Sequence, residues 1–302
     1  MTTNKMIIMV GISGSGKSSA AKILQKEYDA EILSSDEIRE EMGDVNCQTR
    51  NVEVFNTLTK RLNQNLTQGK NVIIDATNLS IKNRKQYLVA ARKYNYDTIA
   101  YITNKPIEQC MKDNVGRDRV VPDYVINKQV LNFQIPFYDE GFDEINFHYS
   151  NHDIDKVNEF RELFHQMNGF DQENPYHNEN LLEHSKSVYN HLLNEEDCPE
   201  TLLIAAKYHD IGKLKTKTFD ENNIAHYYGH DSYGSYLVSS LLTPQAVKLT
   251  KEEFLDICFY VNYHMIPFSI TMPKTERKYE SIFGKEKYNN LCELPPLRIF
   301  DS

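Results

Sequence analysis

The sequence predicts an α/β domain, in which helices cover both faces of a parallel sheet, followed by an all-α domain. In the first half, short apolar runs at residues 6–10, 31–33, 71–75 and 98–103 alternate with longer amphipathic segments at residues 18–28, 52–66, 81–94 and 107–114. Strands that alternate with helices form a parallel sheet that helices wrap. From residue 181 onward, apolar residues recur at three- and four-residue spacing, which is typical of helices.

Length and composition favour two globular domains. The chain has 302 residues, of which 40% are hydrophobic and 25% are charged, and each half is long enough to bury a core. The apolar run at residues 6–10 is too short for a signal peptide or a membrane span, so we expect a cytoplasmic protein without a membrane partner. The five cysteines include no C-x-x-C pair, which favours reduced thiols.

The domain boundary is predicted from a helix and the turn residues that follow it. A helical pattern at residues 153–167 ends at Asn168 and Gly169, and turn-forming residues continue to Pro175. We therefore expect a first domain at residues 1–152, a linker helix at residues 153–172 and a second domain at residues 173–302.

Charge and histidine are distributed unevenly along the chain. Residues 1–150 hold 19 Lys+Arg and 19 Asp+Glu, so the net charge of −9 belongs to the remainder. An acidic chain lacks the broad basic surface of a tight duplex-DNA binder, so any nucleic-acid contact should be local and directed at a strand end. All ten histidines lie at or after His148. This asymmetry predicts phosphate chemistry in the first half and metal chemistry in the second.

A phosphate-binding loop follows the first apolar run and predicts a P-loop NTPase domain. Residues 11–18 match G-x-x-x-x-G-K-[ST] between a predicted strand and a predicted helix. In such a loop, backbone amides surround a β-phosphate, Lys17 bridges phosphate oxygens and the Ser18 hydroxyl ligates Mg²⁺. A Gly/Ser-rich turn without a ligand is the alternative. The residues expected to bind the nucleotide are Gly11, Ser13, Gly14, Ser15, Gly16, Lys17, Ser18 and Ser19.

Two carboxylates follow the next apolar runs. Asp36 comes after the second run, at the edge of the sheet where open α/β folds bind ligands. Its carboxylate can accept the proton of an attacking hydroxyl, and it can also cap the following helix. Asp75 ends the third run, in the position that holds Mg²⁺ or its water shell in P-loop enzymes.

The first 145 or so residues resemble the phage-type 5′-polynucleotide kinase family. The resemblance rests on the phosphate-binding loop, on the D-x-x-R of Asp36 and Arg39, on the run from Asp75 to Asn78, and on an arginine-bearing lid before Val121. It implies ATP and Mg²⁺ as cofactors. It further implies that Asp36 is the general base on a 5′-hydroxyl and that Arg39 holds the acceptor phosphate.

In the same family, lid arginines contact the donor phosphates together with the loop lysine. The resemblance therefore implies catalytic roles for Lys17 and Arg117, with Arg119 as a second lid candidate. The lid departs from the family pattern, because Asp113 stands where its first arginine is expected.

The second half contains an ordered set of possible metal ligands. Imidazole and carboxylate together suit Mn²⁺, Fe²⁺, Co²⁺, Ni²⁺ or Zn²⁺, although each histidine taken alone could equally be a hydrogen-bonded structural residue. The order H…HD…H…H…D resembles the all-α HD phosphohydrolase superfamily, and residues 173–302 resemble the HD domain of bacterial CCA-adding enzymes. The residues that match are His184, His209, Asp210, His230, His264 and Asp301.

This second resemblance implies one or two divalent transition metals. In the superfamily, His184, His209, Asp210 and a late aspartate would hold one metal, and the middle histidines would hold a second metal or the scissile phosphate. The late ligand is Asp301 or, failing that, Asp256. Gly212 is a plausible C-cap of the preceding helix. Lys213 could position a phosphate oxygen or could complement a helix dipole.

Three functions remain open from the sequence. The leading hypothesis is a bifunctional end-healing enzyme, which phosphorylates 5′-OH ends of RNA or DNA from an NTP and hydrolyses a 2′,3′-cyclic phosphate or 3′-phosphate. The alternative is a nucleoside or metabolite kinase joined to an HD nucleotidase. A third possibility is a sensor in which NTP binding only switches conformation. A homo-oligomer is possible in each case.

Overall fold

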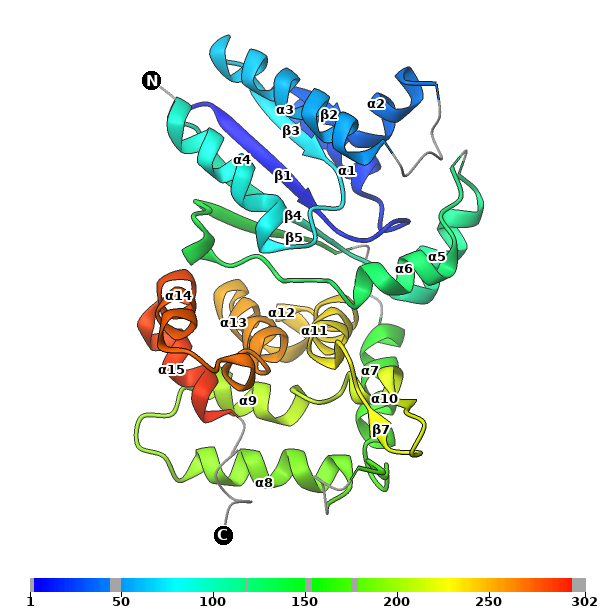
Figure 1. Cartoon of the computed structure of the whole chain (residues 1–302), viewed down its shortest axis with the longest axis vertical. Coiled ribbons are helices and arrows are strands. Elements are labelled where there is room, and N and C mark those ends of the chain that lie inside the picture. The colour runs from blue at the N-terminus through cyan, green and yellow to red at the C-terminus, as the bar shows by residue number, and fades with distance from the viewer. Residues whose placement is uncertain (1–2, 44–49, 118, 150–153, 175–178, 295–302) are drawn as a thin grey trace. The chain divides into compact units, whose positions relative to one another are not determined.

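The computed structural model describes residues 3–43, 50–117, 119–149, 154–174 and 179–294 (Figure 1). The chain forms two compact units. The first comprises Met1–Gln129 and Pro136–Ser150, and the second comprises Val130–Ile135 and Asn151–Ser302. Within the described ranges, every helix is too short or too polar to cross a membrane.

Unit 1 is built on a five-stranded sheet in which all neighbouring strands are parallel. The strands are β1 (Lys5–Val10), β2 (Ala30–Ser34), β3 (Asn71–Asp75), β4 (Asp97–Asn104) and β5 (Glu144–Tyr149), in the spatial order β2-β3-β1-β4-β5. The run from Met6 to Val10 is buried at every position, with at most 1% of each residue exposed. Since successive side chains of a strand point to opposite faces, both faces of the sheet are covered.

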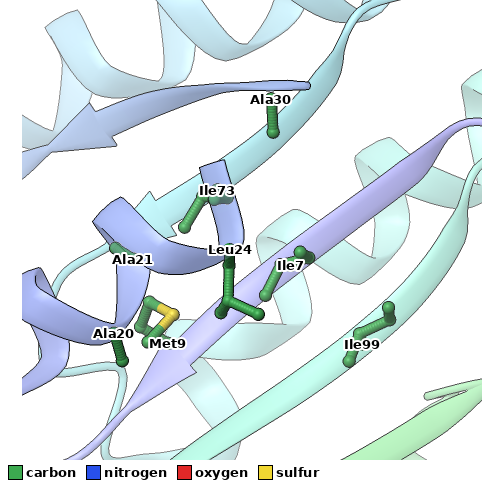
Figure 2. Close-up of a cluster of buried hydrophobic side chains, with 8 residues drawn as sticks. All are labelled: Ile7, Met9, Ala20, Ala21, Leu24, Ala30, Ile73 and Ile99. Carbon is green, nitrogen blue, oxygen red and sulfur yellow. The ribbon is translucent and has the colours of Figure 1, made fainter. Parts of the chain in front are cut away.

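Helices cover this sheet as the alternating pattern predicts. Figure 2 shows one side of the core, where Ile7, Met9 and Ile73 of the sheet pack with Ala21 and Leu24 of a helix. The helices of unit 1 are α1 (Lys17–Tyr28), α2 (Ser35–Glu41), α3 (Asn51–Thr67), α4 (Ile81–Tyr94), α5 (Ile107–Val115) and α6 (Asp123–Val130), with a 3₁₀ turn η1 (Tyr138–Glu140).

Strand β5 was not predicted as part of the sheet. This strand pairs with β4 at the edge, with Ile145 beside Ala100 and Phe147 beside Ile102. Its residues alternate polar and apolar, a pattern typical of a strand with one covered face and one more exposed face. That alternation was the available signal, and it is weaker than the continuous apolar runs of β1 and β3.

Unit 2 is helical, so the predicted order of an α/β domain and then a helical domain is confirmed. A short antiparallel hairpin of β6 (Thr218–Phe219) and β7 (Ala225–His226) is an addition to that prediction. The helices are α7 (Ile154–Gln166), α8 (Leu181–Leu193), α9 (Glu200–Tyr208), α10 (Lys213–Thr216), α11 (His230–Leu241), α12 (Pro244–Val247), α13 (Lys251–Tyr263), α14 (Pro273–Phe283) and α15 (Lys285–Glu293), with a 3₁₀ turn η2 (Pro267–Ser269).

Helix α13 lies at the centre of unit 2 and contacts α9, α11 and α12. Helix α7, which was predicted as a linker, packs against α11. Its Phe160 ring also meets the Tyr208 ring of α9 edge to face, with the ring centroids 5.1 Å apart. The segment Val130–Ile135 also belongs to unit 2. The buried Asn262 of α13 donates to the carbonyl of Phe133 and accepts from the amide of Ile135.

Candidate active sites in the two units

The phosphate-binding loop connects β1 to α1 at the carboxyl edge of the sheet. Gly14 and Gly16 have φ angles of +82° and +91°, which non-glycine residues rarely adopt. Gly16 is the N-cap of α1 and brings no capping side chain, so the first amides of the helix remain available to an anion. The conformation is therefore the one that a bound phosphate requires.

Neighbouring elements hold the loop in place. A Cβ atom at Gly14 would lie 2.1 Å from the carbonyl oxygen of Cys110, so α5 packs directly on the loop backbone. Gln129 of α6 accepts from the Ser13 amide at 2.7 Å and donates to the Ser13 hydroxyl at 3.1 Å. The Ser15 hydroxyl lies 2.7 Å from that of Thr103.

The loop borders a cavity of about 500 Å³ within unit 1. Of the predicted nucleotide-binding residues, Gly11 and Ser15 are buried beneath the loop, where the amide of Gly11 donates to the carbonyl of Thr77. The others line the cavity: Ser13, Gly14, Gly16, Lys17, Ser18 and Ser19.

Lys17 is the buried cation of this cavity. Its ammonium donates to the carbonyl of Ile12 at 2.7 Å, and the residue is 9% exposed. Burial lowers the pKa of Lys17, and the nearby carboxylate of Asp75 acts in the opposite direction. A phosphate group in the cavity would place negative charge beside the Lys17 ammonium and so favour its charged form, which burial disfavours.

Asp36 lies on α2 in the same cavity and is surrounded by arginines. Its carboxylate pairs with Arg39 at 3.2 Å, with Arg117 at 3.5 Å and, by a short contact, with Arg119. The N-cap of α2 is Ser34, whose hydroxyl accepts from the backbone of the first turn. Capping is therefore done by Ser34, and the Asp36 carboxylate faces the cavity.

Arg39 is nearly buried and only partly satisfied. Its guanidinium donates to the side chain of Asn51 at 2.8 Å and to the carbonyl of Ser35 at 3.1 Å. Its buried Nε atom has no hydrogen-bond partner among the described residues. Burial, followed by the neighbouring charge of Arg119, lowers the pKa of Arg39. Arg39 also lines the cavity, where its positive charge favours an anionic ligand.

The remaining predicted kinase residues also meet in this cavity. Asp75 ends β3 opposite Ser34 of β2, and both Asp75 and Ser18 line the cavity. A carboxylate and a hydroxyl at this place fit the oxygen ligands that Mg²⁺ prefers. Asp113 also lines the cavity, where it pairs with Lys105 at 2.5 Å.

In unit 2, helix ends and loops bring histidines around one carboxylate. Asp210 lies in the turn after α9 and is 3% exposed. One oxygen, Oδ2, lies 3.4 Å from Nε2 of His184 and 3.3 Å from Nε2 of His209. The other oxygen, Oδ1, lies 3.1 Å from Nε2 of His230 and 3.6 Å from Nε2 of His264. The five side chains thus form two groups that share Asp210.

The imidazoles are oriented by the backbone. Nδ1 of His209, His230 and His264 each lies 2.7–2.8 Å from a carbonyl oxygen three residues earlier. When Nδ1 donates to that carbonyl, Nε2 carries the lone pair.

The donor set fits a divalent cation. Nε2 of His230 lies 3.1 Å from Nε2 of His264, and both face a carboxylate oxygen. With both Nδ1 atoms donating to carbonyls, these buried groups would all be acceptors, and a shared cation would relieve their repulsion. Imidazole and carboxylate are suitable ligands for a transition metal.

Asp210 carries the negative charge of this cluster. Burial alone would raise its pKa, but the Lys213 ammonium at 2.9 Å, and then His209, hold the pKa of Asp210 well below its usual range. Lys213 also donates to Gln172 at 2.9 Å and is 5% exposed. It lies in the four-residue helix α10, where it and Lys215 are the basic residues of the last turn, so its expected role beside a helix dipole stays a prediction.

Close backbone packing brings the cluster together. The C-cap of α9 is His209 and Gly212 is the N-cap of α10, so the expectation that Gly212 would cap the preceding helix is wrong. A Cβ atom there would lie 2.0 Å from the carbonyl oxygen of His230 and 2.7 Å from the amide of Gly234. Glycine at this position lets the turn that carries His209 and Asp210 touch the backbone of α11.

The late ligand had two candidates in the sequence, and their outcomes differ. Asp301 lies outside the described residues. Asp256, the fallback, is on α13 and pairs with Lys287 of α15 at 2.5 Å. The two metal-binding groups found among the described residues do not include it.

Three residues that take part in the two candidate sites were not predicted from the sequence. Lys105, Gln129 and Gln172 have no motif of their own, and each contributes through a contact between segments distant in sequence. Arg119 was only a second candidate, yet it contacts Asp36 more closely than Arg117 does.

Two family models match separate parts of the chain. Residues 6–136 match a model described as "AAA domain", and residues 181–294 match one described as "HD domain". The first range includes the phosphate-binding loop and the arginines around Asp36. The second includes the five side chains of the histidine–carboxylate cluster.

Similar proteins match only part of the chain. A curated protein of Acanthamoeba polyphaga mimivirus, named "Putative bifunctional polynucleotide phosphatase/kinase", is 32% identical over 149 residues. The match covers 47% of this chain and 32% of that protein, so the chain spans about a third of the length of this curated relative.

Two solved structures are similar to the chain at low identity. One, described as the Pnkp1/Rnl/Hen1 RNA repair complex, is 23% identical with a TM-score of 0.40, over 44% of each chain. The APS kinase CysC of Mycobacterium tuberculosis in complex with AMPPNP and APS is 16% identical with a TM-score of 0.37, over 56% of this chain and 100% of that one.

Proposed function

We propose that this chain, which joins an AAA domain to an HD domain, restores broken nucleic-acid ends to a form that can be ligated. Unit 1 transfers a phosphate from ATP to a 5′-hydroxyl, and unit 2 hydrolyses a 2′,3′-cyclic phosphate or a 3′-phosphate. The observation that carries the proposal is the carboxylate of Asp36, held among arginines in the cavity of the phosphate-binding loop.

The transfer in unit 1 requires one base and several cations. The 5′-oxygen attacks the γ-phosphorus, its proton passes to Asp36, and ADP leaves with the electrons of the broken P–O bond. Lys17, Arg117 and Arg119 neutralise charge on the donor phosphates, and Arg39, which lines the same cavity, binds a phosphate of the acceptor strand. Positioning and charge neutralisation supply most of the catalysis in phosphoryl transfer.

Metal ions complete both sites in this proposal. Mg²⁺ would be held by Ser18 and Asp75 and would neutralise the phosphates of ATP. In unit 2, His184 and His209 with Asp210 would hold one ion, of Mn²⁺, Fe²⁺, Co²⁺, Ni²⁺ or Zn²⁺, and Asp210 could share a second with His230 and His264. Such an ion supplies Lewis-acid polarisation of a phosphate oxygen and lowers the pKa of bound water.

Lys213 has a separate role in unit 2. Its ammonium is fixed between Asp210 and Gln172, and it holds the carboxylate in the ionised form. The shared carboxylate is thereby kept ready to bind cations.

The pairing of the two sites supports a nucleic-acid substrate. Cleavage that leaves a 2′,3′-cyclic phosphate on one strand end leaves a 5′-hydroxyl on the other, so one break requires both reactions. Tethering the two activities raises their effective concentration at that break. The name of the mimivirus relative, which combines a polynucleotide phosphatase with a kinase, supports the same assignment.

The test uses a short RNA with a 5′-hydroxyl and a 2′,3′-cyclic phosphate. The protein is incubated with γ-labelled ATP, Mg²⁺ and Mn²⁺, and both ends are followed. We expect label at the 5′ end and loss of the cyclic phosphate. Asp36→Asn should lower only the first activity, by about 10²- to 10⁴-fold for a lost general base, and Asp210→Asn should lower only the second.

Each variant serves as the control for the other, because the two residues lie in different units. If neither RNA end changes while mononucleotides or small metabolites are consumed, the end-healing proposal is wrong and the small-substrate alternative replaces it. Hydrolysis of ATP without transfer to any hydroxyl would instead favour a sensor.

A further inference from the structure

Lys105 is a second lysine at the phosphate-binding loop, contributed by a different element from Lys17. It follows β4 and lines the same cavity. Its ammonium lies 3.9 Å from the place that a Cβ atom on Gly16 would occupy. Since Gly16 is the N-cap of α1, this cation lies beside the N-terminus of a twelve-residue helix.

A cation is electrostatically unfavourable at that position unless an anion joins it. The N-terminus of a helix carries partial positive charge, which attracts anions and repels cations. The cavity is lined by the cations of Lys17, Arg39, Lys105, Arg117 and Arg119 and by the carboxylates of Asp36, Asp75 and Asp113, so the formal charge of its lining is +2. The accumulated charge would be neutralised by a ligand with several negative charges.

Asp113 explains how Lys105 is held there before a ligand binds. The Asp113 carboxylate of α5 accepts from the Lys105 ammonium at 2.5 Å and from the Gln109 amide at 2.6 Å. The hydrogen bond from Lys105, the largest cause, lowers the pKa of Asp113 and so keeps it ionised.

We propose that Lys105 binds the phosphates of the donor nucleotide and that Asp113, supported by Gln109, positions it. This inference rests on the proposed kinase function of unit 1 and identifies a phosphate ligand outside the loop motif. Lys17 reaches the phosphates from within the loop, and Lys105 reaches them from the end of β4 beside Gly16. The ligand class is a nucleoside triphosphate or diphosphate, since unit 1 is proposed to use ATP and Lys105 would bind its phosphates.

The test measures nucleotide binding directly, without requiring turnover. Lys105→Met removes the charge and keeps the alkyl chain, and it should weaken ATP binding about 10- to 100-fold, as expected for a hydrogen bond to a charged group. Lys105→Arg should retain most of the affinity. The matched control is Lys112→Met, which removes an exposed lysine of α5 that does not line the cavity.

A ligand series separates phosphate binding from general damage to the cavity. Lys105→Met should weaken the binding of ATP and ADP but leave that of adenosine unchanged, and its melting temperature should match that of the wild type. Equal losses for ATP and adenosine, or ATP binding as tight as in the wild type, would overturn the inference.

A double-mutant cycle tests the positioning role of Asp113. In the wild-type background, Asp113→Asn should weaken ATP binding several-fold because Lys105 loses its anchor. In the Lys105→Met background the same change should strengthen binding, because it removes an unpaired anion from the phosphate cavity. Effects of the same sign in both backgrounds would contradict a role through Lys105.

The binding measurement is independent of the acceptor. If the wild type binds ATP and responds to Lys105→Met but does not phosphorylate a 5′-hydroxyl, the proposed function fails and the Lys105 inference stands. If the wild type labels the 5′ end and Lys105→Met binds ATP normally, the inference fails and the proposed function stands.

Discussion

Replacing Gly212 by alanine should dismantle the histidine–carboxylate cluster without touching any of its side chains. The new Cβ would lie 2.0 Å from the carbonyl oxygen of His230, whereas real Cβ contacts are essentially never shorter than 3.0 Å. The two backbones must therefore separate by about 1 Å, which is the difference between these two distances. Because the nearest atoms, His230 O and Gly234 N, both belong to the backbone, the displacement changes the approach of the Gly212 turn to α11.

The consequences can be estimated from that displacement. His230 Nε2 lies 3.1 Å from Asp210 Oδ1, and a shift of this size would separate them. Overpacking of this kind costs about 1–3 kcal/mol of stability. Disturbing the support of a metal ligand weakens metal affinity by roughly 10- to 100-fold, and a misplacement of this size can lower turnover by on the order of 10²-fold.

Gly234→Ala is the matched control, because this glycine faces Gly212 across the same contact. Its Cβ would have Gly212 N at 3.3 Å and Val261 Cγ1 at 3.4 Å as nearest atoms, which requires shifts of only a few tenths of an ångström. Alanine within a helix also gains about 0.5–1 kcal/mol over glycine. Titration calorimetry with Mn²⁺ and thermal unfolding would compare the variants. Wild-type Mn²⁺ affinity in Gly212→Ala would refute the packing argument.

Three further outcomes follow from the structure. Gly14→Ala should abolish ATP binding, because a Cβ would meet the carbonyl of Cys110 at 2.1 Å and the φ of +82° is strained for alanine; normal nucleotide binding by equilibrium dialysis would contradict this. Arg84→Met should cost about 3–5 kcal/mol in urea unfolding, because it leaves the fully buried carboxylate of Glu140 unpaired, whereas the exposed Lys85→Met should change little. Burial raises the pKa of Glu140 and Arg84 opposes that rise, so without Arg84 the folded state should bind the proton more tightly than the unfolded chain. Stability of that variant should then be greatest below the unfolded pKa and fall as pH rises through the folded pKa. Finally, EDTA should lower the calorimetric unfolding temperature of unit 2, since the proposed transition-metal ligands all lie in unit 2; an unchanged unit 2 transition would argue against a bound metal.

The phosphate-binding loop could be predicted in detail because its information is local. Consecutive residues between Gly11 and Ser18 specify both the backbone conformation and the chemistry, and the structure places Gly14 and Gly16 at positive φ. The adjacent His209 and Asp210 carry local information of the same kind. The role of Asp36 was harder to predict, because a carboxylate at the start of a helix can also act as its cap. The hydroxyl of Ser34 resolves the ambiguity by capping α2 itself.

The lid arginines show where the sequence argument becomes incomplete. Arg117 and Arg119 are two residues apart, and only the fold shows that both reach Asp36. Lys105 was missed because nothing in its neighbourhood marks it as a ligand. Its position depends on Gly16, which lies 89 positions earlier in the chain.

By itself, the sequence determined the order of an α/β domain and a helical domain, the loop that binds phosphate, and the residue types available for metal binding. Short-range periodicity and spacing carry that information, since they act through backbone conformation. Only the tertiary structure decided that His184, His230 and His264 meet around the single carboxylate of Asp210. Their meeting depends on how closely helices approach, and at Gly212 that approach is set by the absence of one Cβ atom.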